Sequence, residues 1–268
     1  MISRQRFLIV VLLLAAYPLR APAQDSDFAG LVDIGGDRKM YLECRGVGSP
    51  TVFIVPGGRA AADEWTTTSP IFNDVAKLTR VCVYDRPGTP LANGSPSRSD
   101  PAPMPTTAGA SVADLHALVV TAKIETPFVI VGHSYGGLVV RLFAMTYPQD
   151  VDGIVLVDAL SEFLRSEETT EEWAWQKKIL NGDLTEALKV YPHLERADAD
   201  VSFDQLLAAS PLQPMPLVVL SADVQWGPLV QGFIEQGMLA PDTPQTSAMS
   251  PTALGRLLKP ISPRSFLA

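Results

Sequence analysis

Ser134 is the residue of this chain whose surroundings are best suited to covalent chemistry. It stands at the centre of Gly132-His133-Ser134-Tyr135-Gly136, which matches the pattern G-x-S-x-G of a nucleophile elbow. A serine at the tip of a sharp strand-to-helix turn has a strained backbone. The residues two positions before and after it must be small, because strand and helix pass close together there. The turn also predicts that the amide of Tyr135 lies at a helix N-terminus, where it can donate to an oxyanion.

The residues around this motif favour an elbow over the simpler alternative, a tight turn that carries a solvated serine. Residues 128–131 are all apolar, as expected for a strand that is buried on both faces. Residues 138–145 are mostly apolar and suit a helix that packs on a sheet. We therefore expect a buried strand, the serine turn and a packed helix in direct succession.

Length, composition and charge set limits on the protein class. The chain has 268 residues, of which 47% are hydrophobic, so one domain of α/β size with a substantial core is expected. The formal net charge of −8 argues against a nucleic-acid partner. The sequence has no cluster of Cys and His ligands and no phosphate-binding loop, so we expect no metal or organic cofactor.

Residues 1–23 have the pattern of a cleavable signal peptide. Arg4 and Arg6 supply the positive start, and residues 7–17 form an apolar run that is too short to span a bilayer. Ala21-Pro22-Ala23 is a small-residue cleavage site. We expect a secreted or periplasmic protein without a stable membrane anchor; the alternative is an uncleaved N-terminal anchor.

Apolar runs and turn residues predict the order of the core elements. Gly35-Gly36-Asp37 is the turn of a hairpin that covers residues 30–46. The loop at residues 89–108 is rich in Pro, Ser, Thr and Gly, and we expect it near the mouth of any site. Besides the strand before Ser134, strands are predicted at residues 51–55, 80–84, 151–157 and 214–220, and helices at residues 69–79 and 110–124.

Residues 161–213 differ from the rest of the chain in composition and in hydrophobic pattern. Between residues 161 and 210 the sequence holds 11 acids against 5 Lys and Arg, in an amphipathic helical pattern. We expect a helical cap insertion between core segments at residues 24–160 and 214–268. Its charges are predicted to form a solvated face, and Trp173 and Trp175 are predicted to pack rather than to bind a ligand.

In motif order, residues 28–223 resemble the α/β-hydrolase superfamily, in the serine hydrolase branch with a helical cap. The resemblance rests on the elbow, on Pro56-Gly57-Gly58 after a strand, on Tyr84-Asp85-Arg86-Pro87-Gly88, and on strands that end at Asp158 and Asp223. It implies an α/β fold with a mostly parallel sheet, an antiparallel second strand, flanking helices and a cap. The implied function is that of an exported serine hydrolase acting on ester-like or other acyl substrates. The implied partner is a small molecule, apolar or an ester.

The resemblance also assigns roles to individual residues. Ser134 matches the nucleophile, and the amides of Tyr135 and of Gly58 or Arg59 match the oxyanion donors. The acid follows a late strand. Asp223 occupies the usual place and is favoured, and Asp158, after the preceding strand, is the alternative.

The general base is the part of the family pattern that this sequence does not match. The resemblance places a histidine after one more strand near the C-terminus, but no histidine follows His193. We expect His133 to pack beneath the turn, His116 to lie on a flanking helix and His193 to lie in the cap. The alternative is that His193 reaches Ser134 as the base, out of the family's chain order. The last strand and its histidine loop are therefore expected to be missing, with an incomplete C-terminus.

Two other functions remain open on this sequence. A catalytically impaired or truncated relative that binds a small apolar ligand is the main alternative to an active hydrolase. A nucleotide-binding protein of the doubly wound type fits less well, because Gly35-Gly36 lies in a hairpin turn rather than after a first parallel strand.

The expected pairing of the two cysteines follows from the same resemblance. In the strand order that it implies, the second and fourth strands adjoin, and these strands contain Cys44 and Cys82. An exported protein folds in an oxidising compartment, so a Cys44–Cys82 disulfide is the hypothesis. Two small buried thiols are the alternative.

Overall fold

The computed structural model describes residues 27–181, 184–221 and 235. Within these residues a seven-stranded sheet with the order β1-β2-β4-β3-β5-β6-β7 runs through the core. β1 pairs with β2 and β2 pairs with β4 in antiparallel fashion, and every other neighbouring pair is parallel. The expectation of a mostly parallel sheet with an antiparallel second strand is confirmed.

The strands lie where the apolar runs and the hairpin turn predicted them. The hairpin closes through Gly35 and Gly36, whose φ angles of 82° and 62° suit glycine. The strands are β1 (Phe28–Gly35), β2 (Arg38–Arg45), β3 (Val52–Val55), β4 (Val81–Tyr84), β5 (Phe128–His133), β6 (Val151–Val157) and β7 (Leu217–Leu220).

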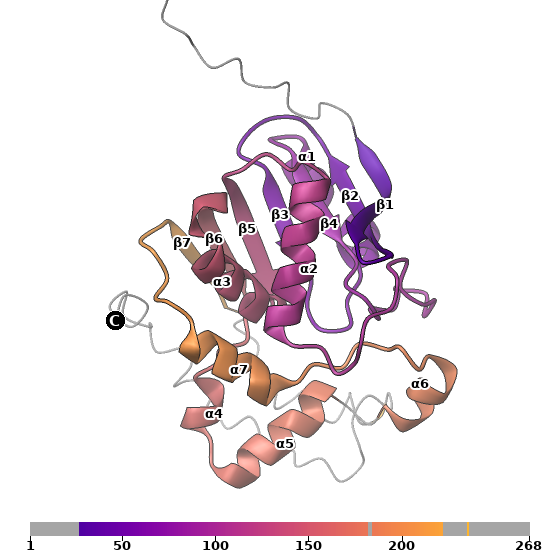
Figure 1. The fold of residues 1–268 in the computed structure, drawn as a ribbon, viewed down its shortest axis with the longest axis vertical. Coiled ribbons are helices and arrows are strands. Elements are labelled where there is room, and N and C mark those ends of the chain that lie inside the picture. Colours follow the sequence, from indigo (N-terminus) through magenta and orange to yellow (C-terminus); the bar gives the residue numbers. More distant parts are fainter. Residues whose placement is uncertain (1–26, 182–183, 222–234, 236–268) are drawn as a thin grey trace, which may run out of the picture.

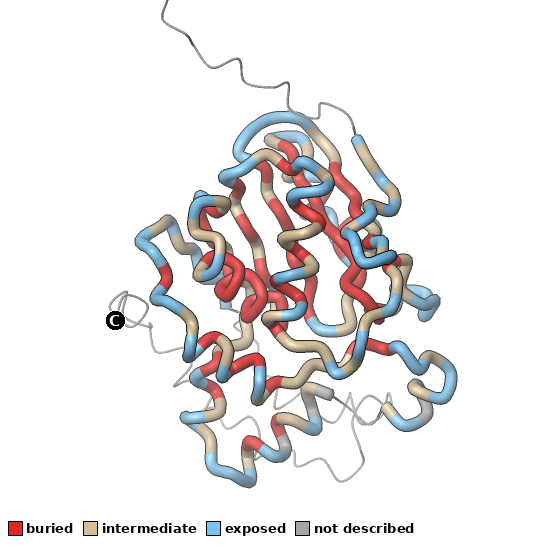
Figure 2. Tube along the Cα trace, viewed as in Figure 1, coloured by how far each residue is buried: buried red, intermediate tan, exposed pale blue. Residues whose placement is uncertain are grey.

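Helices cover both faces of the sheet, so alternate strand residues enter two separate cores. Phe53 points into the larger core, with α2 (Ala108–Thr121) and α3 (Gly136–Thr146). Ile54 points into a smaller core, with the π-helix η1 (Glu64–Thr68) and α1 (Ile71–Ala76). Figure 2 shows the buried residues concentrated in the sheet and in α3. α3 is apolar almost throughout, because one side meets the sheet and another meets α2 and the cap.

In the described part of the segment between β6 and β7, four helices form the cap, which lies beyond one end of the sheet (Figure 1). They are α4 (Leu164–Glu167), α5 (Thr170–Asn181), α6 (Thr185–Val190) and α7 (Ala199–Ala208). Trp173 packs on Phe203 with ring centroids 5.2 Å apart, as predicted for a packing residue. The Trp173 indole donates to Asp200, which also accepts from Lys177, so this cluster holds α5 against α7.

The prediction that the cap charges form a solvated face is wrong for two residues. Glu162 and Glu195 are buried, with relative exposures of 5% and 2%. Each has an arginine partner from the core, Arg141 and Arg86 respectively. Composition could not reveal this, because a buried carboxylate becomes tolerable only when the fold supplies a paired cation.

The start of α2 is where the cap meets the core. Thr107 caps the helix by accepting from the amide of Ala110, and Ser202 and Gln205 of α7 accept from the next free amides, those of Ala108 and Gly109. The cap therefore satisfies backbone donors that would otherwise be buried without a partner.

Cys44 and Cys82 face each other across β2 and β4 and form a disulfide. None of the helices in the described segments is both long enough and apolar enough to cross a bilayer. The predicted signal peptide, Asp223 and the predicted missing strand all concern positions outside the described residues.

Candidate active site

Ser134 occupies the turn between β5 and α3 in a conformation that few side chains adopt. Its φ angle is 49°, in the left-handed region, where a non-glycine residue costs about 1–3 kcal/mol. Its amide donates to the carbonyl of Val157, and its carbonyl accepts from the amides of Gly137 and Leu160. Neighbouring elements on both sides thus hold the strained residue in place.

The two glycines of the motif are required by close packing. A Cβ at Gly132 would lie 2.6 Å from Val140 Cγ2 and 2.7 Å from the carbonyl oxygen of Gly136. A Cβ at Gly136 would lie 2.3 Å from the carbonyl oxygen of Val55 and 2.7 Å from that of Pro56. Both contacts are shorter than real Cβ contacts, so strand, turn and helix reach this proximity only with glycine.

Two backbone amides beside Ser134 make no hydrogen bond to any other described residue, those of Gly58 and Tyr135. A Cβ at Gly58 would lie 3.6 Å from Tyr135 Cβ, so the two residues are in contact range. The third predicted donor differs: the Arg59 amide donates to Glu195 Oε2 at 2.5 Å. Of the alternatives Gly58 and Arg59, the structure therefore leaves the Gly58 amide available.

Residues 56–62, here called the β3 loop, are fixed by the two charged residues that follow β4. The Arg86 guanidinium donates to the carbonyl of Pro56 at 2.7 Å and to that of Gly57. Asp85 accepts from the amide of Ala62 at 2.7 Å. Arg86 and Asp85, which are adjacent in sequence, thus fix the two ends of the β3 loop by hydrogen bonds.

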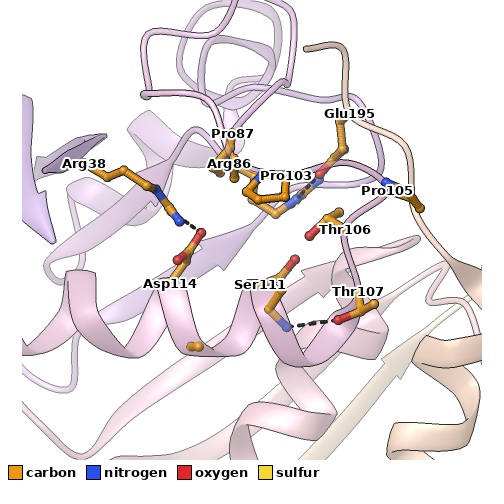
Figure 3. A pocket seen from close by; sticks show the side chains of 13 residues that line it. Arg38, Arg86, Pro87, Pro103, Pro105, Thr106, Thr107, Ser111, Asp114 and Glu195 are labelled. Atoms are coloured by element: carbon orange, nitrogen blue, oxygen red, sulfur yellow. Dashed lines mark hydrogen bonds and ion pairs between the residues drawn. The ribbon is translucent and has the colours of Figure 1, made fainter. Parts of the chain in front are cut away.

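Arg86 is buried and its charge is balanced by Glu195 of the cap. Arg86 Nε lies 2.6 Å from Glu195 Oε1, and both side chains are 2% exposed (Figure 3). Burial acts to lower the pKa of Arg86, but the carboxylate of Glu195 more than offsets this and the pKa is raised. Burial, with the charge of Glu195 as a smaller contribution, also raises the pKa of Tyr135 to about 12. Arg86 therefore stays charged and Tyr135 stays neutral near pH 7.

Residues 158–162, here called the β6 loop, lie on the other side of Ser134. Asp158 has a φ angle of 43°, and its amide donates to the carbonyl of Leu220 in β7. His133 and Val157 pair in the parallel register, so Ser134 and Asp158 leave the sheet at adjacent positions. Arg141 of α3 pairs with Glu162 and donates to the carbonyl of Leu160 at 3.2 Å, which holds this loop against the helix.

None of the three histidines forms a hydrogen bond with Ser134 within the described part of the chain. His116 stacks on Tyr147 with centroids 3.8 Å apart, and lies on α2 as predicted. His133 packs edge-on against Trp65, and its buried Nδ1 has no hydrogen-bond partner among described residues. His193 is exposed, in the cap segment between α6 and α7. Ser134 thus has no imidazole partner in these segments.

A cavity of about 320 Å³ lies beside the Arg86–Glu195 pair, on the α2 side (Figure 3). Its wall includes the Arg38–Asp114 ion pair, Ser111 of α2 and prolines of the loop before α2. Ser134 is not among the residues that line it. The loop at residues 89–108 was expected near a site, and its last part borders this cavity.

The sequence led us to predict Ser134, Gly58 and Tyr135 as site residues, and it did not lead us to the buried residues Glu195 and Arg141 that hold the neighbouring loops. Glu195 lies in the cap sequence Leu194-Glu195-Arg196-Ala197, and nothing in that sequence indicates that its side chain is buried. Arg141 carried a stronger signal, because it interrupts an otherwise apolar helix that packs on the sheet.

A family model described as alpha/beta hydrolase fold matches residues 50–245. An AB hydrolase superfamily protein of Gibberella zeae is 30% identical over 139 residues, which cover 49% of this chain and 40% of that protein. The uncharacterized protein YqjL of Bacillus subtilis is 26% identical over 182 residues, covering 66% of this chain and 64% of that protein. The chain spans between 13% and 64% of the length of the curated relatives that it matches.

The fold likeness extends to solved structures. The alpha/beta hydrolase domain-containing protein 10 from mouse superposes with a TM-score of 0.53 at 14% identity, over 80% of this chain and 86% of that one. At this level of identity the likeness concerns the fold alone.

Proposed function

The chain belongs to the alpha/beta hydrolase fold family, and from this premise we propose that it hydrolyses acyl esters through Ser134. The observation that carries the proposal is the conformation of Ser134, with a positive φ angle at the tip of the β5–α3 turn. A protein gains nothing in stability from a strained serine, so retained strain at a turn between strand and helix points to a role in chemistry.

In the proposed reaction the Ser134 hydroxyl oxygen attacks the ester carbonyl and its proton passes to a general base. The carbonyl oxygen becomes an oxyanion, which the amides of Tyr135 and Gly58 stabilise. The alcohol leaves with a proton, and water then releases the acid from the acyl-enzyme. The free amides support this assignment, since both donors lie beside Ser134. The described residues supply no imidazole contact, so the proposal assigns no residue as the base.

The proposed acid is Asp223, with Asp158 as the alternative. Asp158 leaves β6 beside Ser134, which suits a residue that orients a base. Asp223 lies outside the described residues, three positions after Leu220 in the sequence, and its assignment rests on the family pattern. The substitutions Asp158→Asn and Asp223→Asn separate the two, because removing the true acid lowers kcat by about 10⁴-fold.

We also propose that the protein is exported and acts on a small apolar or ester substrate. The Cys44–Cys82 disulfide supports an oxidising compartment. The acidic net charge of −8 supports a partner other than nucleic acid. Mass spectrometry of protein recovered from the culture medium or periplasm tests cleavage, with a mature N-terminus after Ala23 as the expected result.

Labelling with a fluorophosphonate probe tests the nucleophile directly. We expect the purified chain to bind close to one probe per molecule, and Ser134→Ala to bind none. Ser97→Ala is the matched control, because the Ser97 hydroxyl donates to the Arg86 carbonyl in the core and the residue lies outside the elbow. Labelling that persists in Ser134→Ala would reject Ser134 as the nucleophile.

A second candidate is a catalytically impaired relative that binds a small apolar ligand. The observation that favours it is the absence of an imidazole contact to Ser134 among described residues. Without a base, the serine hydroxyl is a weak nucleophile near pH 7. A folded chain that does not react with the probe, and that hydrolyses no p-nitrophenyl ester, would favour this candidate.

A further inference from the structure

We propose that Glu195 of the cap is a positioning residue that sets the orientation of the β3 loop and, through it, of the Gly58 amide. The inference rests on the proposed function, since it assigns this amide to oxyanion binding. Glu195 itself does not touch the reacting atoms in this arrangement. It acts through Arg86 and through the amide of Arg59.

Both carboxylate oxygens of Glu195 are used. Oε1 accepts from Arg86 Nε at 2.6 Å, while Oε2 accepts from the Arg59 amide at 2.5 Å and from Arg86 Nη2 at 3.2 Å. The same guanidinium donates to the carbonyls of Pro56 and Gly57. Two side chains, both 2% exposed, thus fix three successive peptide groups of the β3 loop.

These contacts determine the direction of the Gly58 amide. In a trans peptide the carbonyl and the N–H of one unit point in opposite directions. The Gly57 carbonyl points toward Arg86, so the N–H of Gly58 points away from Arg86. The next N–H, that of Arg59, points at Glu195, so the Gly58 carbonyl is turned away from the carboxylate. The pair therefore leaves the Gly58 amide as the free donor of the loop.

The charges explain why both partners are needed. A lone carboxylate this close to the elbow would oppose a developing oxyanion, and a lone buried guanidinium would be costly to desolvate. Together they are neutral and rigid. Charge-assisted hydrogen bonds are also stronger than neutral ones, which suits a loop that must not reorient during the reaction.

Glu195 is delivered by the cap rather than by the core. Its amide donates to the carbonyl of Gly88, and the next residue, Arg196, accepts from the amide of Thr106 at 2.7 Å. The Arg59 side chain adds a further link by donating to the carbonyl of Leu180 in α5. Docking of the cap is thereby coupled to the geometry of the β3 loop.

The test compares Glu195→Gln with Asp200→Asn. Gln keeps the size of the side chain but removes the charge and one of the two accepting oxygens. Asp200 links α5 and α7 within the cap and makes no contact with the β3 loop among described residues, so Asp200→Asn controls for general loosening of the cap. A further variant, Glu195→Ala, removes both acceptors, and Glu195→Gln remains informative if the alanine variant fails to fold.

Two readouts are measured on folded protein. With p-nitrophenyl acetate, Glu195→Gln is expected to lower kcat by about tenfold to a hundredfold, less than the loss of a whole oxyanion donor, with KM within about threefold. Hydrogen exchange at the Arg59 amide is expected to be at least about tenfold faster in Glu195→Gln, because a charge-assisted bond is replaced by a neutral one. Asp200→Asn should leave both quantities unchanged.

The outcomes separate this inference from the proposed function. Unchanged kcat and exchange in Glu195→Gln would overturn the inference, and so would equal losses in Glu195→Gln and Asp200→Asn. If the wild type neither hydrolyses the ester nor reacts with a fluorophosphonate, the proposed function fails. Faster exchange of the Arg59 amide in Glu195→Gln would then still support the positioning of the loop, and unchanged exchange would reject it.

Discussion

Two buried arginines flank Ser134, and each holds one loop. Arg86 holds the β3 loop and Arg141 holds the β6 loop, and each is 2% exposed and paired with a buried glutamate. The partners differ in their origin. Glu162 lies between β6 and the first cap helix, 21 positions after Arg141, whereas Glu195 lies between the cap helices α6 and α7, 109 positions after Arg86.

The different origins of the two glutamates indicate which loop beside Ser134 depends on the cap. The β6 loop is anchored to the nucleophile helix itself, through Arg141 and through the bond from Leu160 to the Ser134 carbonyl. The β3 loop is anchored partly to the cap. Displacement of the cap should therefore disturb one side of Ser134 and spare the other.

The largest effects are expected when the arginines are exchanged for Met. Arg86→Met and Arg141→Met each leave a buried carboxylate unpaired, so each should lower the free energy of unfolding by about 3–5 kcal/mol. Chemical denaturation measures this loss. Hydrogen exchange on the native state should then show faster exchange in residues 56–62 only for Arg86→Met and in residues 158–162 only for Arg141→Met. Loosening of both loops in either variant would contradict the separation of the two sides.

A smaller effect is expected from two adjacent glycines of α3. A Cβ at Gly136 would press on the carbonyl of Val55 in the β3 strand, whereas a Cβ at Gly137 would lie 2.4 Å from the Cβ of Ala159 in the β6 loop. Gly136→Ala and Gly137→Ala should each lower the free energy of unfolding by about 1–3 kcal/mol. The loss should be larger for Gly136→Ala, because the backbone of β3 is hydrogen-bonded on both sides and cannot shift to relieve the contact.

The same pair of variants offers a rescue that distinguishes the two loops. Adding Ala159→Gly to Gly137→Ala removes the methyl group that clashes, so thermal unfolding should return most of the way to the wild-type midpoint. Adding Ala159→Gly to Gly136→Ala should bring no recovery. Recovery in both double variants would mean that the two glycines press on a common contact.

The smallest expected effect concerns the cap alone and its dependence on pH. Burial, with a smaller contribution from the charge of Glu172, raises the pKa of Glu168 from 4.5 to about 7. Between these values the folded protein binds more protons at this position than the unfolded chain, so stability falls as pH rises through the range. Glu168→Gln should therefore raise the melting temperature at pH 8 by about 2–4 °C, after allowance for solvent screening.

This gain should shrink steadily as pH falls from 7 and vanish well below pH 4.5, where Glu168 is protonated in both the folded and the unfolded state. Glu167→Gln is the matched control, since Glu167 is exposed and lies next to it. A gain that is constant with pH would show that the charge of Glu168 is not responsible.

The sequence predicted β3 to β7 well because each carries its own apolar run, and it predicted the β1–β2 hairpin because glycines mark its turn. The elbow was predicted for the same reason: close packing at Gly132 and Gly136 leaves a local mark in the sequence. No local sequence pattern indicates the Arg86–Glu195 pair. Its energy depends on a contact between segments 109 positions apart, and either residue alone looks like an ordinary surface charge. Neither the sequence pattern nor the contacts of the described residues identify a general base for Ser134.

The disulfide also determines how the protein responds to a cut in its chain. Cys44 and Cys82 enclose β3, the β3 loop, η1 and α1 in a closed ring. A protease that cleaves one peptide bond inside this ring leaves the two pieces covalently joined. Such nicked protein would migrate as one species in a denaturing gel without reductant and as two fragments after reduction. A single band in a reductant-free gel is therefore no proof that the chain is intact.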